Sequence, residues 1–156
     1  MRRGFTMIEL VFVIVIIGIL AAVAIPKLAA TRDDAKAGTI KSDIGTAINA
    51  IPAWYQGQKE ADIKKAMNID ENVWTLDSSN CVATYTDAEG DTVKMSLVDA
   101  DTNNTLTSCP DTTTSSVKLR IELDNSNGGG IVDMLVSDMN MPTDRNVTVS
   151  GNKVKW

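Results

Sequence analysis

The sequence contains no histidine, only two cysteines, few aromatic residues and no surplus of positive charge. Without histidine, the chain cannot build a Ser-His-Asp or Cys-His catalytic group, or a metal site that depends on imidazole. Its 15 lysines and arginines are outnumbered by 20 aspartates and glutamates, which gives a formal net charge of −5. A chain this acidic is not expected to bind nucleic acid through bulk charge.

Motifs of common enzymes are absent as well. The sequence has no P-loop and no nucleophile elbow, and nothing in it places two carboxylates together. We therefore predict that the chain is not an enzyme, and a membrane-tethered enzyme is the alternative that this argument leaves open.

A long apolar run near the N-terminus, residues 5–25, is the strongest positive feature. Its roughly 21 residues would span about 31 Å as a helix, which matches a hydrocarbon core of ~30 Å. Arg2 and Arg3 precede the run, so the N-terminus should face the cytoplasm and the domain after the run should be periplasmic or extracellular. A cleaved signal peptide is the alternative, but only the stretch LAATRD offers a weak cleavage site.

Helical periodicity continues beyond the apolar run. One stripe of residues keeps the spacing of an amphipathic helix face: Ile40, Ile44, Ala47, Ile48, Ile51 and Tyr55. We predict one helix from about Phe5 to about Ala50, bent near Pro26 and ended by Pro52 and Gly57. The expected divisions are a leader at 1–4, a transmembrane helix at 5–26, its amphipathic continuation at 27–55 and a globular head at 56–156.

The segment GFTMIELVFVIVIIGILAAVAIPK closely resembles the N-terminus of type IV pilins and of the pseudopilins of type II secretion systems. The shared features are a short basic leader, an apolar run, and six residues at the family's offsets: Gly4, Phe5, Thr6, Glu9, Gly18 and Pro26. The resemblance implies that prepilin peptidase cuts after Gly4 and methylates the new N-terminus at Phe5. It also implies that Phe5, together with Thr6, Glu9, Gly18 and Pro26, serves filament assembly.

Glu9 is costly inside an apolar span, by a few kcal/mol even on lenient insertion scales. In the family, the matching glutamate is thought to meet the free amine of a neighbouring subunit, here that of Phe5. Stacking would then convert two unpaired charges into one pair. The alternative is that Glu9 is protonated or that its side chain reaches water near the helix end.

The resemblance implies a structural subunit of a pilus or pseudopilus. Its expected partners are further copies of itself in a helical filament, prepilin peptidase and the pilus or secretion assembly machinery. The subunit would sit in the inner membrane before assembly and in a periplasmic or extracellular filament afterwards. A minor pilin acting as a tip adhesin or DNA-uptake subunit is the alternative, although the acidic, aromatic-poor head does not favour it.

The head is predicted to be an antiparallel sheet covered by the amphipathic helix, an α+β fold of the pilin type. Alternating patterns predict strands at 81–85, 93–98 and 117–123, and a terminal hairpin formed by Val147 and Val149 with Val154 and Trp156. The stretch QKEADIKKAM predicts a short second helix, whereas IVDMLVSDMNM remains ambiguous.

Cys81 and Cys109 are 28 residues apart, and in an oxidising compartment a disulfide between them is the default. Such a bridge is worth about 3 to 4 kcal/mol in the loop-entropy model. Two free buried thiols are the alternative. Many pilins carry a disulfide close to the C-terminus, and the 47 residues after Cys109 set this pair apart from them.

Two acidic loops carry oxygen ligands of the kind that calcium prefers, and no other cofactor is expected. Asp99, Asp101 and Asn103 repeat the first half of an EF-hand loop, but no glutamate stands at the twelfth position. Asp124 opens a second Asp- and Asn-rich stretch. Because these residues are also common in ordinary turns, solvated loops are the alternative.

Overall fold

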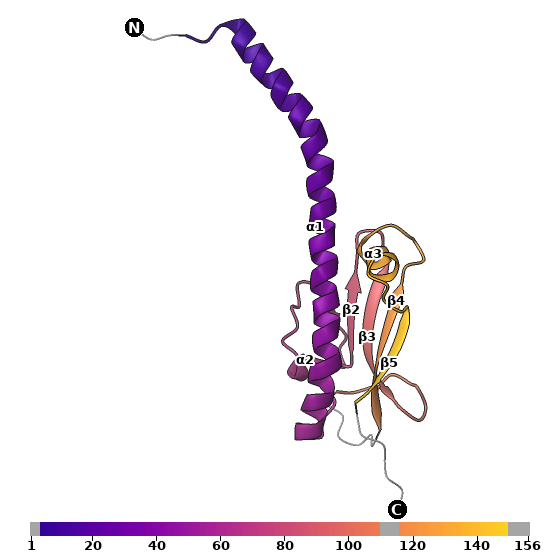
Figure 1. Cartoon of the computed structure of the whole chain (residues 1–156). Coiled ribbons are helices and arrows are strands. Elements are labelled where there is room, and N and C mark those ends of the chain that lie inside the picture. The colour runs from indigo at the N-terminus through magenta and orange to yellow at the C-terminus, as the bar shows by residue number, and fades with distance from the viewer. Residues whose placement is uncertain (1–3, 110–115, 150–156) are drawn as a thin grey trace, which may run out of the picture. The chain divides into compact units, whose positions relative to one another are not determined.

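The computed structural model describes residues 4–109 and 116–149, and the chain divides into two compact units, Met1–Ala35 and Lys36–Trp156. The described elements follow in the order α1, α2, β1 to β4, α3 and β5 (Figure 1). A long helix comes first and an antiparallel sheet follows, so the predicted α+β fold is confirmed.

Helix α1 covers Met7–Gln58 and is 52 residues long. It runs past Ala50 and through Pro52, so the predicted end near Ala50 is wrong. Pro52 removes one backbone donor, but Ile51 and Tyr55 are buried on the head side and hold the last turns in place. The helix stops where Lys59 turns to a positive φ of 57° and donates its N–H to the carbonyl of Tyr55 at 2.8 Å.

The sheet has five antiparallel strands in the order β1-β2-β3-β4-β5, and Figure 1 shows β2 to β5 side by side. Their bounds are Thr75–Leu76, Val82–Thr86, Thr92–Asp99, Val117–Asp124 and Asp144–Thr148. The alternating patterns therefore identified β2, β3 and β4, and the strand around Val147 is β5. It pairs with β4. Val154 and Trp156, the expected partners of a terminal hairpin, lie outside the described residues.

The head core forms where the second half of α1 covers one face of the sheet. The predicted helix stripe supplies its buried side, and alternate strand residues supply the other, including Met95, Leu97, Leu119 and Ile121. Trp74 is 1% exposed, and its indole Nε1 donates to Asp43 Oδ2 on α1 at 2.9 Å. This hydrogen bond ties the helix to the chain segment that enters the sheet.

Two short helices complete the head. Helix α2 covers Ile63–Ala66, inside the predicted QKEADIKKAM segment, and Asp62 caps it by accepting the Lys65 N–H at 3.0 Å. The ambiguous stretch after Gly130 forms helix α3, Ile131–Ser137. Ile131, Val132 and Leu135 fall on one face of α3 and join the core.

Strand β5 is the last strand of the described sheet, and it carries a charge on its core side. Arg145 pairs with Ile121, which is 1% exposed, so the two side chains share the core face of the sheet. Arg145 itself remains exposed. On the opposite face, Asp144 meets Arg120 through an ion pair of 3.3 Å.

Candidate functional site

The first part of α1 presents apolar side chains in all directions. The large apolar residues from Met7 to Leu28 are 40% to 87% exposed. Within the described residues, α1 is long and apolar enough to cross a membrane, judged by length and composition. The most apolar part of this helix is not buried against any other described part of the chain. Lipid or the helices of other chains are the partners that such a surface suits.

Thr6 and Glu9 form a reciprocal cap at the start of α1. The Glu9 amide donates to Thr6 Oγ1 at 3.3 Å, and the Thr6 amide donates to Glu9 Oε2 at 2.8 Å. The Thr6 hydroxyl donates to the same carboxylate oxygen at 2.7 Å. These contacts are those of a capping box, in which two helix-end donors are satisfied at once.

The cap changes how the charge of Glu9 is satisfied. Both donors from Thr6 go to Oε2, and among the described residues no hydrogen bond reaches Oε1. The carboxylate is therefore partly satisfied inside its own chain and keeps one oxygen for a further donor. The sequence signal for this cap was the spacing T-x-x-E, which sequence analysis assigned to assembly alone.

The other residues of the predicted processing and assembly site lie along the same segment, before or within α1. Gly4 and Phe5 precede the helix, and Phe5 is 88% exposed. Gly18 and Pro26 lie inside α1. A Cβ added at Gly4 or at Gly18 would meet nothing within 4 Å. Packing inside the described chain therefore does not explain either glycine.

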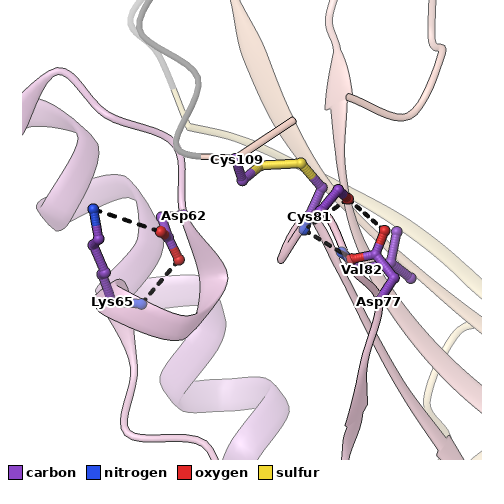
Figure 2. The surroundings of a disulfide bond; sticks show 7 residues. Asp62, Lys65, Asp77, Cys81, Val82 and Cys109 are labelled. Carbon is purple, nitrogen blue, oxygen red and sulfur yellow. Dashed lines mark hydrogen bonds and ion pairs between the residues drawn. A yellow bond between two sulfur atoms is a disulfide. The ribbon is translucent and has the colours of Figure 1, made fainter. Parts of the chain in front are cut away.

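Cys81 and Cys109 form the predicted disulfide, with their Cα atoms 5.4 Å apart (Figure 2). Cys81 lies in the turn between β1 and β2, and Cys109 lies in the connection that follows β3. The Cys109 amide also donates to the carbonyl of Ser79 at 2.9 Å. The bridge thus fastens the long β3–β4 connection to the edge of the sheet that holds β1.

Asp77 organises the turn that carries Cys81, as Figure 2 shows. Its Oδ1 accepts the amides of Cys81 and Val82, each at 3.0 Å, and its other oxygen accepts the Ser79 hydroxyl. Partial burial would raise the pKa of Asp77. The hydrogen bonds from Ser79, Val82 and Cys81 outweigh that effect and hold the pKa below its usual value.

The comparisons with known proteins identify a sequence motif and a partial relative. Residues 1–25 match the family described as the prokaryotic N-terminal methylation motif. The chain carries that motif. It is also similar to the type II secretion system core protein G of Pseudomonas aeruginosa, with 33% identity over 86 residues. No solved structure matches the chain.

The similarity to protein G is partial. The aligned stretch covers 49% of this chain and 61% of the relative, so the chain spans less than two thirds of that protein's length. The methylation motif includes five of the six residues predicted for processing and assembly: Gly4, Phe5, Thr6, Glu9 and Gly18. Pro26 follows directly after the motif.

The two acidic loops predicted to hold calcium lie at opposite ends of the β3–β4 hairpin. Asp99 pairs with Val117 at one end, and Asp124 pairs with Thr92 at the other. Seven residue steps along a strand separate them by on the order of 20 Å. Asp124 and the loop of Asp99 therefore cannot serve one ion.

The carboxylates of these loops already serve their own backbone. Asp99 Oδ1 accepts the amides of Asp101 and Thr102, each at 2.8 Å, and Asn103 sits at a positive φ of 57°. These are ordinary turn contacts. In the part of the chain that the structure describes, no group of three or more acidic or cysteine side chains could hold a metal ion. Calcium binding by these loops stays a prediction.

Proposed function

We propose that this chain is a structural subunit of a type II secretion pseudopilus or a related type IV pilus, assembled through its N-terminal helix. The observation that carries the proposal is the apolar surface from Met7 to Leu28, which is exposed on all sides and lies on the segment with the methylation motif. A subunit that stacks such helices buries this surface and needs no catalytic group.

The pseudopilus is favoured over the pilus by the similarity to a secretion system core protein. In this proposal, prepilin peptidase removes residues 1–4 and methylates Phe5. The N-terminus then begins at the cytoplasmic side of the inner membrane, and the head lies in the periplasm. The secretion machinery draws processed subunits from the membrane into the filament.

Glu9 supplies the electrostatic part of assembly in this proposal. Its Oε2 is engaged by Thr6, while Oε1 faces no donor among the described residues. An incoming subunit can present the amine of its own Phe5 to that oxygen. Both charges are costly in an apolar filament core when unpaired, and the contact fixes the axial register of the new subunit.

Two substitutions separate the charge of Glu9 from its role in the cap. Glu9→Gln keeps an acceptor for the Thr6 amide, because glutamine also completes a capping box, but it removes the charge. Glu9→Leu removes both. We expect both variants to insert in the membrane and to be processed after Gly4, and we expect both to yield few filaments in the native host. The measurement compares membrane and sheared-filament fractions by immunoblot.

Normal filament yield from Glu9→Gln, with loss only in Glu9→Leu, would show that the cap drives assembly and would refute the charge mechanism. Mass spectrometry of the mature protein tests processing separately, because the proposal requires a methylated N-terminus at Phe5. An intact Met1 in assembled filaments would contradict the proposed function itself.

A further inference from the structure

A seam of carboxylates joins two turns at one end of the sheet. The β2–β3 turn contains Asp87 and Asp91, and the loop after β4 leads into α3. Asp87 Oδ2 accepts the amide of Val132 at 3.2 Å, and Asp91 Oδ1 accepts the amide of Asn127 at 2.8 Å. Each carboxylate reaches a backbone amide more than 30 residues away in the chain. The seam therefore fixes the entrance of α3 to the sheet.

The seam is short of donors. Asp91 is 1% exposed, and its Oδ2 has no hydrogen-bond partner in the described structure. Asp87 Oδ1 is already occupied by the amides of Glu89 and Asp91, at 3.1 and 2.9 Å. A further negative charge beside these buried carboxylates would be unfavourable, because few hydrogen-bond donors are available here to stabilise it.

Asn127 lies at the centre of the seam and is followed by Gly128. Asn127 is the one asparagine of the sequence followed by glycine. Both residues are exposed, and Gly128 has a φ of 70°. The Asn127 side-chain amide lies against the β2–β3 turn, because its Nδ2 is 3.6 Å from the position of a Cβ built on Gly90.

We propose that Asn127 is a site of spontaneous deamidation that loosens this seam as the protein ages. The backbone nitrogen of Gly128 attacks the side-chain carbonyl carbon of Asn127. The new N–C bond closes a five-membered imide, the bond from that carbon to Nδ2 breaks, and ammonia leaves with the proton lost by Gly128. Water then opens the imide at either carbonyl and yields aspartate or isoaspartate.

The local structure favours this reaction at Asn127. Glycine lacks the Cβ that hinders approach of the following nitrogen to an asparagine side chain. The Gly128 amide is held only by a 3.2 Å hydrogen bond to the carbonyl of Asn125, within an exposed loop. By contrast, Asn125 is followed by serine, and its Nδ2 donates to Asp133 Oδ1 at 3.2 Å.

Either product damages the seam. Aspartate places a new carboxylate beside the turn of Asp87 and Asp91, and like charges at short range are unfavourable. Isoaspartate also lengthens the backbone by one carbon, which displaces the amide that Asp91 accepts. The expected consequence is a looser connection between the β2–β3 turn and α3.

The test incubates the full chain in detergent at mildly alkaline pH in water enriched in heavy oxygen, followed by peptide mapping. We expect Asn127 to gain one oxygen from water and to convert roughly tenfold faster than Asn125, since its neighbour lacks a Cβ. A parallel sample unfolded in urea gives the rate without the fold. If native Asn127 stays intact while the unfolded sample converts, the fold protects the site and the proposal is overturned.

The matched variant Asn127→Gln should not convert, because attack would require a larger ring, and its melting temperature should stay constant during incubation. The parent should lose melting temperature in step with conversion. Without incubation, Asn127→Asp should already show the part of the decrease in melting temperature that is due to the added negative charge. Faster hydrogen exchange at the Asp91 and Val132 amides should accompany it. Unchanged exchange and melting temperature in fully converted protein would overturn the proposed effect on the seam.

Discussion

At the scale of single residues, carboxylates in this protein serve mainly as acceptors for backbone amides. Glu9 caps α1, Asp62 caps α2, Asp87 holds the start of α3, and Asp77 and Asp99 hold turns. Backbone N–H groups at helix starts and turns lack partners of their own. Several of the acidic residues thus have a structural role. For the stability of these turns and helix starts, the short-range geometry of the contacts matters more than the net charge of the chain.

The first prediction concerns Asp77 and pH. Its pKa is lowered in the folded protein, so its contribution to stability is complete above the unfolded pKa of about 4 and is lost as pH falls through the folded value. Asp77→Asn removes that contribution. Urea unfolding should show a stability gap between parent and variant at pH 7 that narrows below pH 4. A gap that widens on acidification would contradict the assignment.

The second prediction concerns Gly130, which has a φ of 104°. A Cβ at this position would overlap the carboxylate oxygens of Asp87 and Glu89. Gly129 has a φ of 88°, but a Cβ there would meet nothing within 4 Å. We therefore expect Gly129→Ala to cost about 1 kcal/mol from backbone strain, and Gly130→Ala to cost roughly 1 to 3 kcal/mol more. Equal losses in urea unfolding would show that the overlap is relieved at little cost.

At the scale of elements, α1 carries two surfaces of different kind on one continuous helix. Residues up to Ala35 form their own unit, whereas Ala37 and the stripe from Ile40 to Tyr55 belong to the head core. The stripe anchors the helix through side-chain packing, because few positions in it carry polar groups. The stability of the head should therefore depend on the burial of individual stripe residues.

The third prediction compares Ile44→Ala with Ile48→Ala. Ile44 is 2% exposed, whereas Ile48 packs at the margin of the core and is only partly buried. Ile44→Ala should lower the free energy of unfolding by about 2 to 5 kcal/mol, and Ile48→Ala by clearly less. Urea unfolding of both variants in detergent, followed by tryptophan fluorescence, measures the difference. A larger loss for Ile48→Ala would place the core on the wrong face of α1.

The elements differed in how well the sequence predicted them. Strands β2 and β4 were predictable because buried and partly buried residues alternate along most of their length, and β3 alternates in the same way over its first four residues. Strand β1 is two residues long and leaves no pattern to detect. The predicted end of α1 near Ala50 was wrong because the local rule about Pro52 was given more weight than the stripe, which continues to the buried Tyr55.

The same division holds for the candidate site. The N-terminal motif could be predicted because its residues lie at short, fixed spacings. The capping box was overlooked because the T-x-x-E spacing was interpreted only as part of the assembly motif. The seam was not predictable from the sequence, because Asp87 reaches a partner 45 residues away and Asp91 one 36 residues away. Contacts of that range depend on the register of the sheet.

At the scale of the whole molecule, the disulfide is the covalent tie within the head. The fourth prediction is that replacing both Cys81 and Cys109 by serine lowers the free energy of unfolding by about 3 to 4 kcal/mol, because a 28-residue loop is released in the unfolded chain. Urea unfolding in detergent measures the loss. Reducing agent should destabilise the parent by a similar amount and leave the double variant unchanged. Identical midpoints for oxidised and reduced parent would rule out a stabilising bridge.

Arg145 has a consequence for how these heads behave when crowded together. An edge strand offers unpaired backbone groups to any other strand, and sheets that extend in this way aggregate. A strand of another chain could pair with β5 and cover the core face with apolar side chains. This would remove the charged guanidinium of Arg145 from water, which is unfavourable. A shift of the β5 register by one residue would not make the core face of this strand apolar, because it would turn Asp144 and Asn146 toward that face instead. The edge of the described sheet is thus protected in either register, which is consistent with the proposed filament subunit, whose copies would associate through α1 rather than through β5.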